Sequence, residues 1–236
     1  MILQLSDLHI GAPDGDPEGD LARVVDHVGT VGLRPDAVLV SGDLTEHGDP
    51  AEYARARALL EPLGAPLVAL PGNHDRPDAL RAAFPETGHD GALRLLTLDS
   101  SRPGRDDGAL GAEQLGELDA ALGAMPATPT VVALHHPPLT VGMPFLDEIG
   151  LDPGDRDALA AVVTRHPQVA RIVAGHVHMT VAGALGATPV LTAPSTWRVR
   201  ARLRLGRPGW EPEEAPAGFA LHLLRDGALT SHAVTL

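Results

Sequence analysis

Short apolar runs recur along the chain, and each is bounded by turn residues such as Gly, Pro, Asp or Asn. Runs of this length between turn residues are typical of buried β-strands. We therefore expect strands at Ile2–Leu5, Ala37–Val40, Pro66–Leu70, Leu93–Leu98, Thr130–Leu134, Val169–Ala174, Val181–Leu185, Pro189–Thr192, Gly218–Leu224 and Leu229–Leu236.

Stretches rich in Ala, Leu, Arg and Glu separate the early runs and favour helices. We expect helices at about Glu18–Gly32, Pro50–Leu63, Pro77–Phe84, Gly111–Leu122 and Asp155–His166. This alternation predicts an α/β domain whose helices pack on sheets. After Ala174 the helical stretches stop and strand-like runs follow closely, with a hairpin signal at Asp226-Gly227. These later runs predict a second, largely antiparallel sheet stacked on the first.

Two segments, Arg102–Ala109 and Gly206–Gly218, have the composition of loops, and the chain contains no internal repeat or linker. We therefore expect a single domain over residues 1–236. With 44% apolar and 21% charged residues, the composition is that of a folded globular protein.

Composition excludes several kinds of chemistry. The chain has no cysteine, which excludes a disulfide framework, a zinc ribbon, an iron–sulfur site and a thiol nucleophile. All 18 basic residues are Arg, so a lysine-dependent phosphate loop and a Schiff-base mechanism are excluded as well.

The net charge of −13 makes nucleic-acid polymers and anionic membranes poor partners. The N-terminus has no basic segment followed by a long apolar stretch, and no run approaches the ~18 apolar residues of a membrane span. We expect a soluble, cytoplasmic protein, and a homodimer is left open.

Polar residues with metal-binding chemistry gather where the predicted strands end. Five strand ends carry the motifs SDLHIG, SGDLTEHG, LPGNHD, ALHHPP and AGHVHM. Their candidate donors are Asp7, His9, Asp43, Asn73, His135, His176 and His178. Because sites in α/β sheets form at the carboxyl ends of strands, these side chains are expected to converge.

The spacing of the donors supports convergence. Asp7 and His9 are two residues apart, as are His176 and His178, so an extended backbone would point each pair to one face. Gly42, Gly72 and Gly175 directly precede donor residues and permit a close backbone approach.

The size of the donor set indicates two metal ions. A lone strand-end His or Asp is more often a surface or packing residue than a ligand, but five such ends together are hard to explain by packing. Seven donors exceed the needs of one ion and suit two ions that share a bridging carboxylate. Oxygen and imidazole donors without thiolate suit Mn, Fe, Zn or Co, without choosing among them. The remaining histidines are expected to be ordinary surface or packing residues: His27, His47, His89, His166, His222 and His232.

The motif order DLH, GDLTEHG, GNHD, HHPP and GHVH resembles the calcineurin-like metallophosphoesterases over Met1 to about Met179. Within that superfamily, LTLDSS and HHPPLTVGMPFLDEIGL resemble the class III cyclic-nucleotide phosphodiesterases, and bacterial glycerophosphodiesterases share much of the pattern. The resemblance implies a four-layer α/β/β/α sandwich of two stacked mixed sheets flanked by helices.

The resemblance also implies roles for individual residues. Asp7, His9, Asp43 and His178 would hold one metal, and Asp43, Asn73, His135 and His176 the other, with Asp43 as the bridge. His135 is favoured over His136 as the ligand from HHPP. His74 would contact the phosphate and protonate the leaving alkoxide. Asp75 either orients His74 or caps the following helix. Glu46 stands where purple acid phosphatases have a Tyr ligand, so a tyrosinate-bound iron is not expected.

The implied function is binuclear metal-dependent hydrolysis of small phosphodiesters by a metal-activated hydroxide, with 3′,5′-cyclic nucleotides as leading substrates. Glycerophosphodiesters or a broader range of phosphoesters are the alternative, and a non-catalytic scaffold with the same fold is the remote one. Two segments are candidates for setting specificity. The alternating Arg198–Arg204 segment is either an anion-binding strand or, as we favour, a solvated edge strand. Leu139–Leu151 is a candidate lid or specificity loop.

Overall fold

The computed structural model describes all residues from Met1 to Leu236. Its strands are β1 (Ile2–Leu5), β2 (Ala37–Ser41), β3 (Leu67–Leu70), β4 (Gly88–His89), β5 (Arg94–Thr97), β6 (Thr130–Ala133), β7 (Val169–Ala174), β8 (Ala182–Leu185), β9 (Thr188–Thr192), β10 (Val199–Ala201), β11 (Pro212–Glu214), β12 (Gly218–Arg225) and β13 (Ala228–Thr235). Its helices are α1 (Pro17–Thr30), α2 (Pro50–Leu60), the 3₁₀ turn η1 (Glu61–Leu63), α3 (Pro77–Ala83), α4 (Ala112–Ala124), α5 (Pro144–Glu148) and α6 (Pro153–Thr164).

Most strands belong to two mixed sheets. The first sheet has the order β13-β12-β1-β2-β3, in which β1, β2 and β3 are parallel and the β12–β13 hairpin is antiparallel to β1. The second has the order β4-β5-β6-β7-β9-β8, with β5, β6, β7 and β9 parallel. Strands β10 and β11 form a separate two-stranded hairpin.

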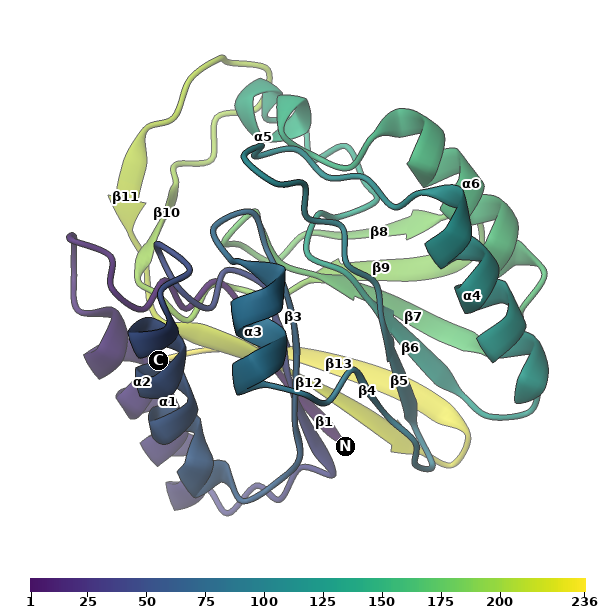
Figure 1. The fold of residues 1–236 in the computed structure, drawn as a ribbon, viewed down its shortest axis with the longest axis horizontal. Helices are drawn as coiled ribbons and strands as arrows, with labels where there is room; N and C mark the ends of the chain where they lie inside the picture. Colours follow the sequence, from purple (N-terminus) through teal and green to yellow (C-terminus); the bar gives the residue numbers. More distant parts are fainter.

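The two sheets stack between two layers of helices (Figure 1). One apolar core lies between the first sheet and α1, α2 and α3, and another lies between the second sheet and α4 and α6. A third core joins the sheets to each other through Ile2, Leu39, Val68, Leu70, Leu93, Leu95, Val131, Ala133 and Val173. The predicted four-layer α/β/β/α sandwich is confirmed. The shared third core supports the single domain, which stays a prediction.

Three helices begin at an Asp-Pro pair. Asp16, Asp49 and Asp152 cap α1, α2 and α6 by accepting backbone hydrogen bonds, and each is followed by Pro at the first helical position. These caps satisfy N–H groups that the helix leaves unpaired, and proline has no N–H to lose there. In α2, Glu52 completes a capping box with Asp49.

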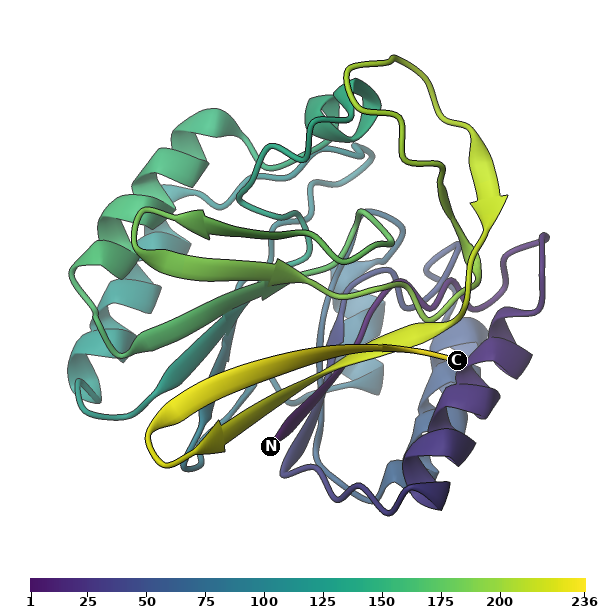
Figure 2. The same ribbon diagram turned by 180° about the vertical axis from the view of Figure 1, so that it is seen from behind.

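The grouping of the later strands differs from the expectation. They do not form an antiparallel sheet of their own: β8 and β9 extend the second sheet, whereas β12 and β13 pair beside β1 in the first. Figure 2 shows the yellow β12–β13 hairpin running along the first sheet, away from β8 and β9. Partner choice between distant segments depends on the packing of the whole chain, which the local pattern does not contain.

Smaller differences concern segments near the site. The expected loop Gly206–Gly218 contains β11, and the Leu139–Leu151 segment contains the short helix α5. The tip of the β10–β11 hairpin reaches toward α5 at the top of Figure 1. No helix in this structure combines the length and the apolar character that crossing a bilayer requires.

Candidate metal centre

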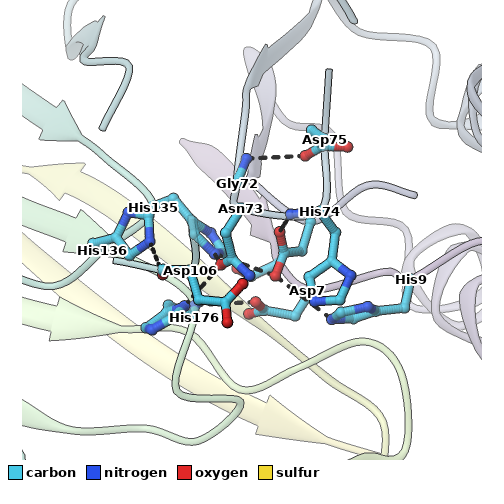
Figure 3. A network of polar contacts seen from close by, with 12 residues as sticks. Asp7, His9, Gly72, Asn73, His74, Asp75, Asp106, His135, His136 and His176 are labelled. Carbon is cyan, nitrogen blue, oxygen red and sulfur yellow. Dashed lines mark hydrogen bonds and ion pairs between the residues drawn. The ribbon is translucent and has the colours of Figure 1, made fainter. Parts of the chain in front are cut away.

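The loops that follow five parallel strands meet at one edge of the sandwich. They follow β1, β2 and β3 of the first sheet and β6 and β7 of the second, so the site joins two sheets rather than lying on one continuous sheet. Backbone hydrogen bonds tie the loops together, from Asp7 N to Gly42 O at 3.1 Å and from Gly175 N to His135 O at 3.0 Å. Figure 3 shows the resulting cluster of side chains.

The backbone of this edge is strained. Six non-glycine residues have positive φ, and five of them are candidate ligands: Asp7 (54°), His9 (48°), Asp43 (50°), His176 (69°) and His178 (55°). The extended backbone assumed from the i, i+2 spacing is therefore wrong, because both members of each pair are left-handed. Strain of this kind persists only where the surroundings enforce it, and it clusters at functional sites.

Two glycines allow the loops to approach one another. A Cβ atom on Gly42, whose φ is +94°, would lie 2.2 Å from His135 Nδ1. A Cβ on Gly72 would lie 2.1 Å from Asp43 Oδ1 and 2.5 Å from the Asp43 nitrogen. No side chain fits at those distances, so both positions require glycine.

The first donor group is Asp7, His9, Asp43 and His178, all buried, with ligand atoms within 4.8 Å of one another. His9 donates from Nδ1 to Glu46 Oε2 at 2.8 Å, and His178 donates from Nδ1 to the Val199 carbonyl at 2.6 Å. The opposite nitrogen of each ring, Nε2, faces the other ring at 3.2 Å. Both rings are thus oriented to present a lone pair to the same point.

The second donor group lies on the other side of Asp43. Asn73 Oδ1 lies 3.2 Å from His135 Nε2 and 3.1 Å from His176 Nδ1. His135 donates from Nδ1 to the Ser41 carbonyl at 2.9 Å, which leaves Nε2 turned toward the cluster. The structure thus brings together all seven candidate ligands from the sequence.

Asp43 stands between the two groups. Its Oδ2 atom lies 3.7 Å from His9 Nε2 and 3.3 Å from His135 Nε2. Its Oδ1 atom accepts a hydrogen bond from the backbone nitrogen of His74 at 3.0 Å. One carboxylate oxygen therefore faces imidazoles of both groups, which is the placement that a bridging ligand needs.

The electrostatics of the cluster follow from burial and proximity. Burial opposes ionisation of Asp43, but the neighbouring His135 and His9 outweigh it and hold the pKa of Asp43 well below its usual range. Burial likewise opposes protonation of His135, yet Asp43 raises its pKa to about 9. For His176 and His178 burial prevails and lowers the pKa. A charged carboxylate thus lies among buried imidazoles, two of which stay neutral.

These residues fit a metal centre for a reason internal to the structure. Asp7 Oδ2 and His176 Nε2 are buried without any hydrogen-bond partner, and the Nε2 lone pairs of His9 and His178 face each other. Buried polar atoms without a partner cost free energy. A cation is the one group that all of these electron-pair donors could coordinate together. The absence of thiolate suits Mn, Fe, Zn or Co.

His136 is buried beside His135, but both of its ring nitrogens are engaged. Nε2 donates to the Asp106 carbonyl at 3.0 Å, and Nδ1 accepts from the Ser100 hydroxyl at 2.9 Å. Burial, aided by the charge of His135, lowers the pKa of His136 to about 3, so the ring is neutral. This geometry supports His135 as the ligand. His136 instead holds residues 100–106 in place through its hydrogen bonds to Ser100 and Asp106.

His74 lies at the mouth of the site. Its ring is 4.8 Å from the His9 ring, centroid to centroid, and Nδ1 donates to the Glu46 carbonyl at 3.2 Å. His74 lines the cavity, and with Nδ1 held in this way Nε2 is the ring nitrogen left free. Figure 3 shows the His74 ring beside that of His9.

The structure contradicts both interpretations of Asp75. The residue at the N-cap of α3 is Arg76, and none of the hydrogen bonds of the Asp75 carboxylate reaches the His74 ring. Asp75 instead accepts from Leu44 N, Thr45 N, Thr45 Oγ1, Tyr53 Oη and Gly72 N. Its role is to tie the loop after β3 to the loop after β2, which positions Asn73 against Asp43.

The sequence interpretation missed several residues that line the cavity above the cluster. The cavity has a volume of about 470 Å³, and its walls include Glu46, Asp106, Trp197 and Trp210, together with Phe145 from the Leu139–Leu151 segment, which the sequence had already marked as a candidate specificity loop. Glu46 could have been suspected from its position three residues after Asp43. The two tryptophans carry no motif, and only the fold brings them to the site.

The arginines of the Arg198–Arg204 segment do not line this cavity. They pair with glutamates on and beside β11: Arg198 with Glu214, Arg200 with Glu213, Arg202 with Glu211 and Glu213, and Arg204 with Glu211. Each arginine is thus paired with a glutamate of the same hairpin and not directed into the cavity, which supports the solvated-strand interpretation over anion recognition.

Residues 1–180 match the calcineurin-like phosphoesterase family. The chain is 36% identical to a probable cyclic nucleotide phosphodiesterase of Synechococcus, over 98% of this chain and 90% of the relative. It is 35% identical to a glycerophosphodiester phosphodiesterase of Enterobacter lignolyticus, over 83% and 77%.

A similar fold is also found in distant proteins. The structure superimposes on GAP50, described as the anchor in the inner membrane complex of Plasmodium, with a TM-score of 0.68 at 14% identity, covering 99% of this chain and 84% of that one. The family match and the relatives carry the assignment. The chain therefore belongs to the calcineurin-like phosphoesterase family, and its relatives place it among the phosphodiesterases of that family, which are hydrolases.

Proposed function

We propose that this protein hydrolyses small phosphodiesters with two metal ions, and that 3′,5′-cyclic nucleotides are its leading substrates. Relatives named for cyclic nucleotides and for glycerophosphodiesters match at similar identity, so glycerophosphodiesters are the second candidate. The metals are Mn or Fe, with Zn or Co also compatible with the donor set. We propose a cytoplasmic location, as expected from the sequence.

The observation that carries the proposal is the position of Asp43. Its Oδ2 atom faces imidazole nitrogens of both donor groups at 3.7 and 3.3 Å, within a cluster that contains unpartnered buried donor atoms. Asp7, His9 and His178 would complete one metal site with Asp43. Asn73, His135 and His176 would complete the other.

When bound, such a metal pair lowers the pKa of a water molecule and offsets charge on the phosphoryl oxygens. The side chains of the protein perform the remaining tasks. His74 faces the cavity with Nε2 while the Glu46 carbonyl holds its Nδ1–H, so the protonated ring can donate its Nε2 proton to the leaving alkoxide. Asp75 keeps the loop that carries His74 fixed against the loop that carries Asp43.

The charge of the cavity wall favours diesters over monoesters. No Arg lines the cavity, and its wall includes the carboxylates Glu46 and Asp106. A phosphodiester carries one negative charge and a monoester near neutral pH carries nearly two, so the second charge of a monoester meets no side-chain counter-ion. We therefore expect monoester cleavage to be a side activity.

The test combines metal content with a substrate panel. Purified protein, reconstituted in turn with Mn, Fe, Zn and Co, is assayed against cyclic AMP, cyclic GMP, 2′,3′-cyclic nucleotides, glycerophosphodiesters and bis(p-nitrophenyl) phosphate. We expect two metals per chain and the highest kcat/KM on a 3′,5′-cyclic nucleotide. A protein that binds two metals yet hydrolyses no diester would instead be a scaffold.

The bridge is tested by Asp43→Asn, which keeps the shape of the side chain and removes its charge. We expect elemental analysis to find that both metals are lost together. The matched control is Asp49→Asn, at the exposed N-cap of α2, which is expected to keep two metals. Retention of both metals by Asp43→Asn would contradict the shared ligand.

A further inference from the structure

The wall of the cavity holds an unusual share of the aromatic side chains of the protein. The chain contains only two Trp, three Phe and one Tyr. Both tryptophans, Trp197 and Trp210, line the cavity together with Phe145. These residues come from separate segments: Phe145 from α5, Trp197 from the stretch before β10, and Trp210 from the tip of the β10–β11 hairpin. The fold therefore concentrates flat apolar surface at one polar site.

Trp197 is held rigidly against the donor cluster. Its ring centroid lies 4.7 Å from that of His9, and its Nε1–H donates to the Asp14 carbonyl at 3.1 Å. Its backbone nitrogen donates to the Asp7 carbonyl at 3.2 Å. Because its polar atom is already satisfied, Trp197 offers the cavity only an apolar ring.

Trp210 is less enclosed. The residue is 42% exposed, although its ring lies 6.4 Å from the His178 ring and 6.0 Å from the Phe145 ring, centroid to centroid. An aromatic ring that stays partly in water gains less free energy from burial than an enclosed ring does. A ligand that covered the Trp210 ring would supply the rest of that free energy. The hairpin that carries it is anchored to the site, because the Val199 carbonyl accepts the His178 Nδ1–H.

The aromatic residues lie on a definite side of the site. The Trp197 ring lies against His9, and the Trp210 ring lies against His178. The His74 ring also lies against His9. The candidate proton donor to the leaving oxygen is therefore adjacent to the aromatic wall. The leaving group of the ester is the part of the substrate that would meet that wall.

We propose that Trp197 and Trp210 set substrate specificity by stacking on a planar ring in the leaving group, and thus that the site selects nucleoside over glyceryl phosphodiesters. The inference rests on the proposed phosphodiesterase function. A nucleobase has a π-face that stacks on indole, whereas a glyceryl group has none. The remaining polar wall, Glu46 and Asp106, is open to hydroxyl groups of either class of substrate.

The kinetic test compares two substrates in matched variants. Trp210→Leu is expected to lower kcat/KM for cyclic AMP about 5- to 100-fold. It should leave kcat/KM for glycerophosphoethanolamine within about twofold, and Trp210→Tyr should restore most of the loss for cyclic AMP. The control is Leu205→Ala on the same hairpin tip, where Leu205 is 65% exposed and does not line the cavity. Equal losses on both substrates, or no loss on either, would overturn the proposal.

A binding test separates this inference from the proposed function. Trp197→Phe and Trp210→Phe each leave a single tryptophan, so intrinsic fluorescence of the metal-free protein reports on one wall residue at a time. Cyclic AMP is expected to change the emission of both variants in a saturable way, and glycerophosphoethanolamine of neither. Saturable changes without turnover by the metal-loaded protein would refute the phosphodiesterase function and retain the stacking site. Turnover of cyclic AMP without any such change would refute the stacking site alone.

Discussion

Five candidate ligands hold left-handed backbone conformations, each of which costs about 1–3 kcal/mol for a residue other than glycine. Neighbouring loops enforce this strain through backbone hydrogen bonds such as His9 N to Asp43 O at 2.9 Å. The protein thus spends folding stability to hold Asp and His side chains around a single point. At the residue scale, the site is a set of side chains whose positions depend on the rest of the fold.

His74 is the residue whose loss should separate chemistry from metal binding. Because its ring faces the cavity and is not part of either donor group around Asp43, His74→Ala is expected to lower kcat about 10²- to 10⁴-fold. Elemental analysis of the same preparation should still find two metals. The exposed His232→Ala serves as the control and should change neither quantity. Loss of metals from His74→Ala would mean that this ring is a ligand.

Glu46 should control metal affinity without being a ligand in our assignment. It accepts the Nδ1–H of His9 at 2.8 Å and so turns Nε2 toward the cluster. Glu46→Ala is expected to weaken metal binding about 10- to 100-fold, and Glu46→Gln, which keeps an accepting oxygen, should weaken it less. Calorimetric titration of Mn into metal-free protein measures both, with the exposed Glu61→Ala as the control. Equal affinities in all four proteins would exclude this orienting role.

At the scale of elements, local pattern predicts most of the fold. The strands that became β1, β2, β3, β6 and β7 are short and mostly apolar, and buried strands leave that signature in sequence because both faces are covered. The location of the site could be predicted as well, because each of these strands ends in a ligand motif. Pairing partners could not be predicted, because β12 pairs with β1 across more than 200 residues of sequence, for example Ile2 with His222.

The β10–β11 hairpin shows where local pattern fails. Its tip is rich in Gly and Pro, which indicates a loop. The alternation of its arginines does not indicate which glutamates they pair with. The paired strands are only three residues long and belong to neither large sheet. Trp210 reaches the site only because this hairpin folds over α5. Nothing in the sequence of the tip indicates that contact.

The arginines of this hairpin should be dispensable for catalysis. Arg202 pairs with Glu211 at 3.3 Å and with Glu213 at 3.4 Å in an exposed setting, where an ion pair contributes about 0–1 kcal/mol. Arg202→Gln is therefore expected to change kcat/KM for cyclic AMP less than threefold, and to leave its dependence on ionic strength unchanged. A tenfold rise in KM that disappears at high salt would restore the anion-binding interpretation.

At the scale of the whole molecule, a buried polar chain links the C-terminal hairpin to the metal centre through both sheets. Ser231 Oγ donates to His222 Nδ1 at 2.7 Å, and His222 Nε2 donates to Gln4 Oε1 at 2.9 Å. Gln4 Nε2 donates in turn to Ser41 Oγ at 2.8 Å and to the Ala174 carbonyl of the second sheet at 3.1 Å. The Ser41 carbonyl then accepts from His135. His222, expected to be an ordinary residue, is part of the support beneath the site.

This chain predicts how stability depends on pH. Burial, aided by the charge of Arg171, lowers the pKa of His222 to about 3, whereas an unfolded His titrates near 6.5. The unfolded state therefore binds more protons between these values. The stability contributed by neutral His222 is complete above about pH 6.5 and is lost as the pH falls toward 3, by about 2 kcal/mol between pH 7 and pH 5.

The pH dependence is measured by urea unfolding of metal-free protein at pH 7, 6 and 5. His222→Gln can still donate to Gln4 and accept from Ser231 but cannot take up a proton. Its free energy of unfolding should consequently fall about 2 kcal/mol less than that of the wild type over this range. His232→Gln, on the exposed adjacent strand, is expected to follow the wild type. The other titrating groups, including the ligand histidines, are common to all three proteins, so the difference isolates His222. If His222→Gln and wild type lose stability in parallel, the imidazole is not held neutral by the fold.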